Sequence, residues 1–311
     1  MNRDAIAILC LCSHLCKASD AKPLTPTEWG RYARILYERG LRPADLAGLS
    51  VSEVEHTLVV DEKMAQRVCR LLEREGSLAF EIARYENMGV HAITRADDAY
   101  PKKLRHALQD TCPPVLYAVG NLELLGNPAI GFVGSRSIGE EDEAFAASTV
   151  ERVASAGFGV VSGGARGVDS VSAAAALDAG VSLVEYLGHS LQKHARRHDR
   201  REALMEGRAV ALSSSVPDAG FSAGALMGRN KYIYAHSQAT VVVRSDKGSG
   251  GTWSGATEAM RKGLCPVLCQ NRADYEGNQA LLALGAIPVD DTWDGDPRSV
   301  VPDDPQPPLF G

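Results

Sequence analysis

Two hydrophobic patterns divide the chain, and the first covers residues 1–90. Apolar positions there recur at helical spacing, as Trp29, Tyr32 and Leu36 do along one stripe. The stripe follows Thr25-Pro-Thr-Glu28, which combines a capping box with proline at the first helical position. The pattern predicts a small N-terminal helical domain, with helices at about 5–12, 26–39, 61–75 and 77–88.

From residue 115 onward, short apolar runs alternate with helical stretches. Strands are expected at 115–119, 129–133, 159–161, 182–187, 209–212, 240–243 and 266–269, and helices near 141–156, 170–179, 196–206, 224–236, 252–262 and 277–285. This alternation predicts an α/β fold with a mainly parallel sheet and helices on both faces. The expected organisation is a helical domain at 1–90, an α/β domain at 91–294 whose first part, 91–114, is a connector, and a flexible proline-rich tail at 295–311.

Two glycine turns in the α/β part carry the main functional signal. The first contains Gly134, Ser135, Arg136 and Ser137, and the second contains Ser162, Gly163, Gly164 and Arg166. Each follows a predicted strand, and the carboxyl ends of neighbouring parallel strands open on the edge where such folds bind phosphate. Glycines and serines would bring backbone N–H groups and hydroxyls to an anion, with the following helix adding its free N–H groups, and each arginine would add a charge-assisted fork. For the first turn alone, a tight turn with Arg136 in a surface ion pair is the preferred explanation, and the second turn is what favours a ligand site. Asp169 is expected to cap the next helix.

A third and a fourth element extend this candidate anion site. The third is Arg229, Asn230 and Lys231, and the fourth is the turn Ser249, Gly250, Gly251 and Thr252. Arg229 and Lys231 are two residues apart, so they can share one ligand only if a helix begins near them, and Asn230 suits either a base edge or a cap. Glu258 is the acid placed where a general acid or base could sit, but a single carboxylate is thin evidence for hydrolysis.

Composition restricts the partners. The formal net charge is −6, so nucleic-acid binding would need a local basic patch. The run at 188–201 is such a patch, with Lys193, Arg196, Arg197, Arg200 and Arg201 against the single acid Asp199, and it could contact a nucleic-acid backbone or be a solvated helix face.

The remaining composition indicates a reduced, cytoplasmic protein. Most of the 7 cysteines lie in apolar runs, which is typical of buried thiols, and no cysteine–histidine pattern suits a metal, so neither a metal nor a cofactor is expected. No apolar run is long enough to span a membrane. The short apolar run at 5–12 is reminiscent of a signal peptide, but Asp4 and His14 at its ends favour a core helix.

Residues 97–270 resemble the DprA/Smf family of DNA-processing proteins. The matching segments, in order, are Asp98-Ala-Tyr-Pro-Lys-Lys-Leu104, Pro113-Pro-Val-Leu-Tyr117 with Gly120-Asn121, Val133-Gly-Ser-Arg136, Ser162-Gly-Gly-Ala-Arg-Gly-Val-Asp169 and Arg229-Asn-Lys231. The resemblance implies an extended Rossmann-like fold, binding of single-stranded DNA and loading of the RecA recombinase, usually by a homodimer, in recombination and natural transformation. It also implies that Arg136, Arg166, Arg229 and Lys231 contact the DNA.

Several positions depart from that family and leave an alternative open. Gly164 stands where the family usually has leucine, and the fourth turn, Gly248-Ser-Gly-Gly-Thr-Trp253, is similar to that of the LOG, or lysine-decarboxylase-like, nucleotide-processing family. The alternative function is therefore a nucleotide-binding sensor, or an enzyme that cleaves an N-glycosidic bond with help from Glu258. A non-enzymatic DNA-binding protein is the preferred interpretation.

The tail contains a second resemblance. Gln306-Pro-Pro-Leu-Phe310 is similar to the short peptide with which bacterial proteins bind the replication sliding clamp. A disordered tail could present Leu309 and Phe310 to an apolar pocket while Gln306 forms hydrogen bonds beside it.

Overall fold

The computed structural model describes residues 1–16, 21–220 and 222–301, which form two compact units. Unit 1 comprises Met1–Gly126 and Leu187–Arg229, and unit 2 comprises Asn127–Tyr186 and Asn230–Gly311. Both units contain strands and helices, so neither corresponds to the helical domain expected at 1–90 alone. No helix among the described residues is long and apolar enough to cross a lipid bilayer.

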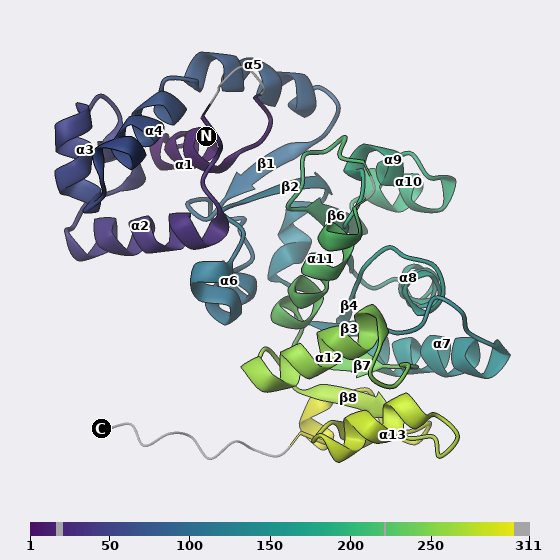
Figure 1. Cartoon of the computed structure of the whole chain (residues 1–311). Helices are drawn as coiled ribbons and strands as arrows, with labels where there is room; N and C mark the ends of the chain where they lie inside the picture. The colour runs from purple at the N-terminus through teal and green to yellow at the C-terminus, as the bar shows by residue number, and fades with distance from the viewer. Residues whose placement is uncertain (17–20, 221, 302–311) are drawn as a thin grey trace. The chain divides into compact units, whose positions relative to one another are not determined.

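Unit 1 begins with helices and continues into a small antiparallel sheet (Figure 1). Its elements are α1 (Arg3–Cys12), α2 (Pro26–Glu38), α3 (Val51–Leu58), α4 (Glu62–Leu72), α5 (Glu75–Glu86), β1 (His91–Thr94), α6 (Lys102–Leu108), β2 (Val115–Gly120), α9 (Leu191–Ala195), α10 (His198–Met205) and β6 (Ala209–Ser213). Strand β2 pairs antiparallel with β1 on one side and with β6 on the other. The predicted N-terminal helices are confirmed, whereas α3, α9, β1 and α6 were not predicted, and the last two lie in the expected connector.

Local sequence explains how the helices of unit 1 begin and end. The predicted capping box of α2 is present, with the Thr25 side chain accepting from the Glu28 N–H and the Glu28 carboxylate accepting from the Thr25 N–H. The C-terminus of α1 is satisfied by the buried guanidinium of Arg74, which donates to the carbonyls of Cys10 at 2.7 Å and Ser13 at 2.6 Å. A charged side chain is thus buried where helical carbonyls would otherwise lack donors.

Glu28 makes the stability of unit 1 depend on pH. Partial burial opposes its ionisation, but hydrogen bonds from Arg67 and Thr25 outweigh burial and lower the pKa of Glu28 to about 2. Because the folded pKa lies below the unfolded value of 4.5, this carboxylate stabilises the fold above pH 4.5, and the contribution is lost as the pH falls through 2. We expect Glu28→Gln to be less stable than the wild type at pH 7. In urea titrations, the difference in free energy of unfolding between the two proteins should decrease between pH 4.5 and 2. The same difference at every pH would contradict this.

Unit 2 is a doubly wound parallel sheet. Its strands are β3 (Ala129–Val133), β4 (Gly159–Ser162), β5 (Leu183–Tyr186), β7 (Thr240–Val242), β8 (Val267–Gln270) and β9 (Ile287–Val289), in the spatial order β5-β4-β3-β7-β8-β9. Its helices are α7 (Glu140–Ser155), α8 (Val168–Asp178), α12 (Gly250–Lys262), α13 (Glu276–Ala283) and the C-terminal part of α11 (Ala223–His236). The predicted parallel sheet is confirmed, and β9 is an additional short strand.

The strand order of unit 2 reverses between β3 and β7. The chain proceeds outward from β3 through β4 to β5, and later from β7 through β8 to β9. Right-handed crossovers therefore place α7 and α8 on one face and α12 and α13 on the other. In such sheets ligands bind outside the carboxyl ends of the strands at this reversal, which here is the β3/β7 junction.

Candidate anion-binding edge

The first turn contacts the segment that directly follows β7 at the β3/β7 junction. The Val243 N–H donates to the Val133 carbonyl at 3.1 Å, and the Ser135 N–H donates to the Arg244 carbonyl at 2.9 Å. The backbone that leaves β3 is thus hydrogen-bonded to the backbone that leaves β7. We name this edge of unit 2, with the turns that follow β3, β4 and β7, the strand-end edge.

The second turn packs against the first through glycine. A Cβ on Gly134 would lie 2.4 Å from Val168 Cγ2, and a Cβ on Gly167 would lie 2.3 Å from the Ser135 carbonyl oxygen. The Val168 N–H donates to that same carbonyl at 3.3 Å. Because Gly167 also has a φ of +74°, only glycine suits both its conformation and its close approach. Arg136 and Arg166 therefore extend from two turns in direct backbone contact.

Both arginines are exposed and available. Within the part of the chain that the structure describes, neither the Arg136 nor the Arg166 guanidinium forms a hydrogen bond or an ion pair. A surface ion pair of Arg136, the alternative explanation for the first turn, is therefore not observed among the described residues. Two unpartnered guanidinium groups on touching turns can bind an anion without losing an internal partner.

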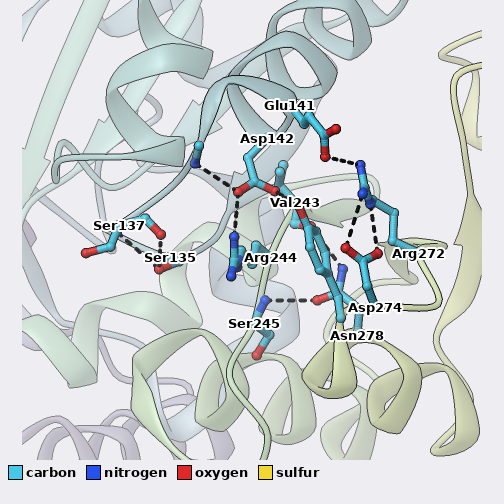
Figure 2. Close-up of polar contacts among 12 residues, drawn as sticks. Ser135, Ser137, Glu141, Asp142, Val243, Arg244, Ser245, Arg272, Asp274 and Asn278 are labelled. Atoms are coloured by element: carbon cyan, nitrogen blue, oxygen red, sulfur yellow. Dashed lines mark hydrogen bonds and ion pairs between the residues drawn. The ribbon is translucent and has the colours of Figure 1, made fainter.

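The other predicted residues of these turns have mainly internal roles. The Ser135 hydroxyl donates to the Ser137 carbonyl at 2.9 Å and accepts from the Ser137 N–H at 3.1 Å, which closes the first turn (Figure 2). Ser162 is fully buried, and its hydroxyl faces the Phe132 carbonyl at 3.4 Å. Gly163 is buried, as is Gly164, which has a φ of +67°. These serines and glycines shape the turns, whereas the arginines face solvent.

Asp169 has the structural role expected of it, by a different contact. It lies in the first turn of α8 instead of preceding that helix, and it is 6% exposed. Its carboxylate accepts from the Ala165 N–H at 3.2 Å and so holds the loop that carries Arg166.

The helices after the first and fourth turns differ in charge. The first turn of α7 contains four acids, Glu140, Glu141, Asp142 and Glu143, whereas the first turn of α12 contains none. These carboxylates disfavour an anion at the start of α7, so the expectation that its N–H groups bind a ligand stays a prediction. Helix α12 keeps that end available, with exposed Ser249 at its N-cap and Gly250 in its first turn.

The third element lies within α11 and not at its start. Because α11 begins at Ala223, Arg229 and Lys231 are well inside the helix, and two residues along a helix turn their side chains about 200° apart. Arg229 is only 6% exposed, and the Lys231 ammonium lies 5.5 Å from the Tyr232 ring centroid. The condition for both cations to share one ligand is not met. Asn230 instead donates to the Gly251 carbonyl at 3.0 Å, and so supports the fourth turn.

Glu258 is remote from the strand-end edge. It lies eight residues after Gly250, about 12 Å along the helix axis at 1.5 Å per residue. Its carboxylate forms an ion pair with Lys262 at 2.6 Å, one turn further along α12. Glu258 is therefore not placed beside the fourth turn for cleavage of a glycosidic bond.

A buried carboxylate that was not predicted from the sequence joins the start of α7 to the segment that follows β7. Asp142 is 1% exposed and accepts three hydrogen bonds, from the Gly139 N–H at 3.2 Å, Arg244 Nη1 at 3.0 Å and the Tyr275 hydroxyl at 2.6 Å (Figure 2). Burial and this hydrogen bond raise the pKa of Tyr275 to about 12, so the phenol remains a donor at neutral pH. The sequence signal for this contact was Arg244, a charged residue that follows an apolar strand.

Asn278 holds the segment that follows β7 from inside the protein. It is fully buried, its Oδ1 accepts from the Ser245 N–H at 2.9 Å, and its Nδ2 donates to the Val243 carbonyl at 2.9 Å (Figure 2). The same Nδ2 donates to the Gln270 carbonyl at 3.0 Å, so one amide is hydrogen-bonded to the ends of both β7 and β8.

Comparison with known proteins agrees with this fold, which defines a Rossmann-like protein of the doubly wound class. The family model for DNA recombination-mediator protein A matches residues 91–294. The chain therefore belongs to the family of DNA recombination-mediator protein A, the DprA/Smf family.

Individual relatives support the same conclusion. Protein Smf of Escherichia coli is 31% identical over 217 residues, which cover 68% of this chain and 58% of that protein. DNA processing protein DprA of Bacillus subtilis is 27% identical over 184 residues, covering 58% of this chain and 61% of the relative. The chain thus spans about three fifths of the length of these relatives.

Solved structures show the fold. DprA of Streptococcus pneumoniae aligns with a TM-score of 0.72 at 20% identity, covering 93% of this chain and 95% of that one. DprA of Helicobacter pylori, described with its single-stranded DNA binding mode, aligns with a TM-score of 0.54 at 22% identity, covering 64% of this chain and 90% of that one.

Proposed function

We propose that this protein binds single-stranded DNA at the strand-end edge. The observation that carries the proposal is the pair of exposed, unpartnered guanidinium groups, Arg136 and Arg166, on two turns in backbone contact. The acid-free start of α12 adds a second group of donors at the same junction. The single-stranded DNA binding of the Helicobacter pylori relative supports the choice of ligand.

The predicted residues take different roles in this proposal. Arg136 and Arg166 bind phosphates, and the backbone N–H groups of Ser249, Gly250, Gly251 and Thr252 bind a neighbouring phosphate. Asn230 holds the fourth turn through the Gly251 carbonyl and half-buried Lys231 adds positive charge, whereas Arg229 is buried. Affinity is then mostly independent of base sequence and falls with salt.

A salt series tests the proposal. We expect fluorescence anisotropy to show tighter binding to a labelled oligothymidylate than to duplex DNA of equal length, with a logarithmic affinity that falls linearly with the logarithm of salt concentration. Adenosine monophosphate at millimolar concentration should not displace the oligonucleotide. Displacement would favour a mononucleotide site, and equal affinity for duplex and single strands would contradict the proposal.

The alternative, a nucleotide hydrolase, is less well supported because Glu258 pairs with Lys262 and lies away from the fourth turn. Release of free base from nucleoside monophosphates, abolished in Glu258→Gln, would reverse this ranking.

The cellular role proposed here follows the family. We infer that the protein acts in the cytoplasm as a homodimer in DNA recombination, including natural transformation, and loads RecA on single-stranded DNA. Faster assembly of RecA filaments on protected single strands in its presence would support this role, and no acceleration would contradict it.

Binding to the sliding clamp remains a separate proposal. Gln306, Leu309 and Phe310 lie outside the described residues. A peptide of residues 300–311 that fails to bind the clamp at high micromolar concentration would exclude this contact.

A further inference from the structure

Unit 1 contains a groove that the proposed function does not use. Its volume is about 530 Å³, and it lies between the end of α5, the end of β2 and the pair α9–α10. The lining includes Met88, Gln192, Arg196, Arg201 and Met205, and none of its lining residues is acidic. The groove therefore has a cationic side, formed by α9 and α10, and an apolar side.

The structure divides the basic run of α9 and α10 into two groups. Arg197 and Arg200 are bound internally by Asp199, at 2.6 Å and 3.2 Å. Arg200 is 3% exposed, and the hydrogen bond from Arg197 lowers the pKa of Asp199, so this internal cluster stays charged. These two arginines have a structural role.

The second group of cations is exposed. Among the residues that the structure describes, Lys193, Arg196 and Arg201 form no hydrogen bond or ion pair through their side chains. Arg196 and Arg201 both line the groove. In a chain with a net charge of −6, this local excess of positive charge favours an anionic ligand.

The apolar side of the groove has exposed thioethers. Met88 is 44% exposed and Met205 is 75% exposed, and Gln192 Nε2 lies 3.4 Å from Met88 Sδ. Gly89 and Gly207 leave the neighbouring wall without side chains. Thioethers are flexible and polarisable, and they make favourable contacts with aromatic rings, so this side of the groove suits a nucleic-acid base.

We propose that this groove is a second binding site for single-stranded nucleic acid, with a base against Met88 and Met205 and phosphates on Arg196 and Arg201. The proposal rests on the proposed function for its ligand class but uses none of the same residues. A peptide cannot add as a strand to β2 here, because β2 is already paired with β1 and β6. The exposed cations beside the thioethers match the phosphates and the base of a nucleotide.

The test compares variants of the full chain for binding to a labelled 20-nucleotide oligothymidylate across a salt series. Arg196→Glu with Arg201→Glu should lower the affinity about tenfold and make the salt slope shallower by about 1.4, since each lost phosphate contact on a single strand changes it by about 0.7. Met205→Ala should weaken binding about threefold and leave the slope unchanged, because it removes apolar contact surface and no charge. The matched control is Arg31→Glu with Arg70→Glu, which changes the same charge at exposed positions of α2 and α4.

Each outcome decides the proposal. An unchanged slope in the Arg196/Arg201 variant, or a slope change equal to that of the control, overturns the site. Unchanged affinity in Met205→Ala overturns the placement of a base in the groove. The Arg136/Arg166 variant is measured in parallel, and a loss there with no loss in the Arg196/Arg201 variant refutes this inference while the proposed function stands. The converse result refutes the strand-end edge and keeps the groove.

Discussion

Replacement of Arg136 and Arg166 together by glutamate is expected to weaken binding of single-stranded DNA about a hundredfold at moderate salt. Two charge-assisted forks are lost and two repulsive charges are introduced, which together cost about 3 kcal/mol. The slope of logarithmic affinity against logarithmic salt concentration should become shallower by about 1.4, because two phosphate contacts disappear. Fluorescence anisotropy with an oligothymidylate at salt concentrations between about 50 and 300 mM measures both the affinity and the slope.

The control for this experiment is the Arg31→Glu, Arg70→Glu variant, which carries the same change of net charge. Arg136 and Arg166 are exposed and make no internal contact within the described chain, so their replacement should leave the unfolding temperature unchanged. Wild-type affinity and slope in the Arg136/Arg166 variant would exclude the strand-end edge as the DNA site.

Gly167→Ala is expected to be strongly destabilising, by about 2–5 kcal/mol. The positive φ of 74° costs an alanine about 1–2 kcal/mol. The new methyl group must also displace the Ser135 carbonyl, which would lie only 2.3 Å from it, and overpacking of this kind costs about 1–3 kcal/mol. Urea unfolding followed by circular dichroism gives the free energy directly, and DNA affinity at low urea should fall as well, because the two arginine-bearing turns separate.

Gly180→Ala is the comparison that shows the effect of a positive φ without the steric contact made at position 167. Gly180 has a φ of +72°, close to that of Gly167, but a Cβ there would meet nothing within 4 Å. We therefore expect this variant to lose only the conformational component and to keep DNA affinity. Equal losses of stability in the two variants would show that the contact between the turns contributes nothing.

The sequence predicted those parts of the edge that depend on local patterns. Buried strands followed by glycine turns were recognisable, and so were the arginines within them, because a residue in a tight turn between small neighbours has little to pack against. Burial was not predictable from the same patterns. Ser162 and Arg229 suited a ligand site by residue type, but one is fully buried and the other is 6% exposed, since neighbouring elements cover them.

Contacts between residues far apart in the sequence account for most of the other features that the sequence did not predict. Strand β1 is four residues long, and its partner in β2 is distant in sequence, so its apolar pattern is too short to predict a strand. The role of Asp142 depends on Arg244 and Tyr275, more than 100 residues away along the chain. The four acids at the start of α7 were visible in the sequence, and their effect on the helix N-terminus could have been inferred.

The first turns of α7 and α12 differ in charge, so the two sides of the strand-end edge differ in their attraction for an anion. The two helices start beside adjacent strands, β3 and β7, and one start is acidic while the other is free of acids. A polyanion that passes over Arg136 and Arg166 is repelled on the α7 side and attracted on the α12 side. A bound strand would therefore leave the edge by one route, and because a DNA strand has distinct 5′ and 3′ ends, a fixed route is the first requirement for a protein that distinguishes between them.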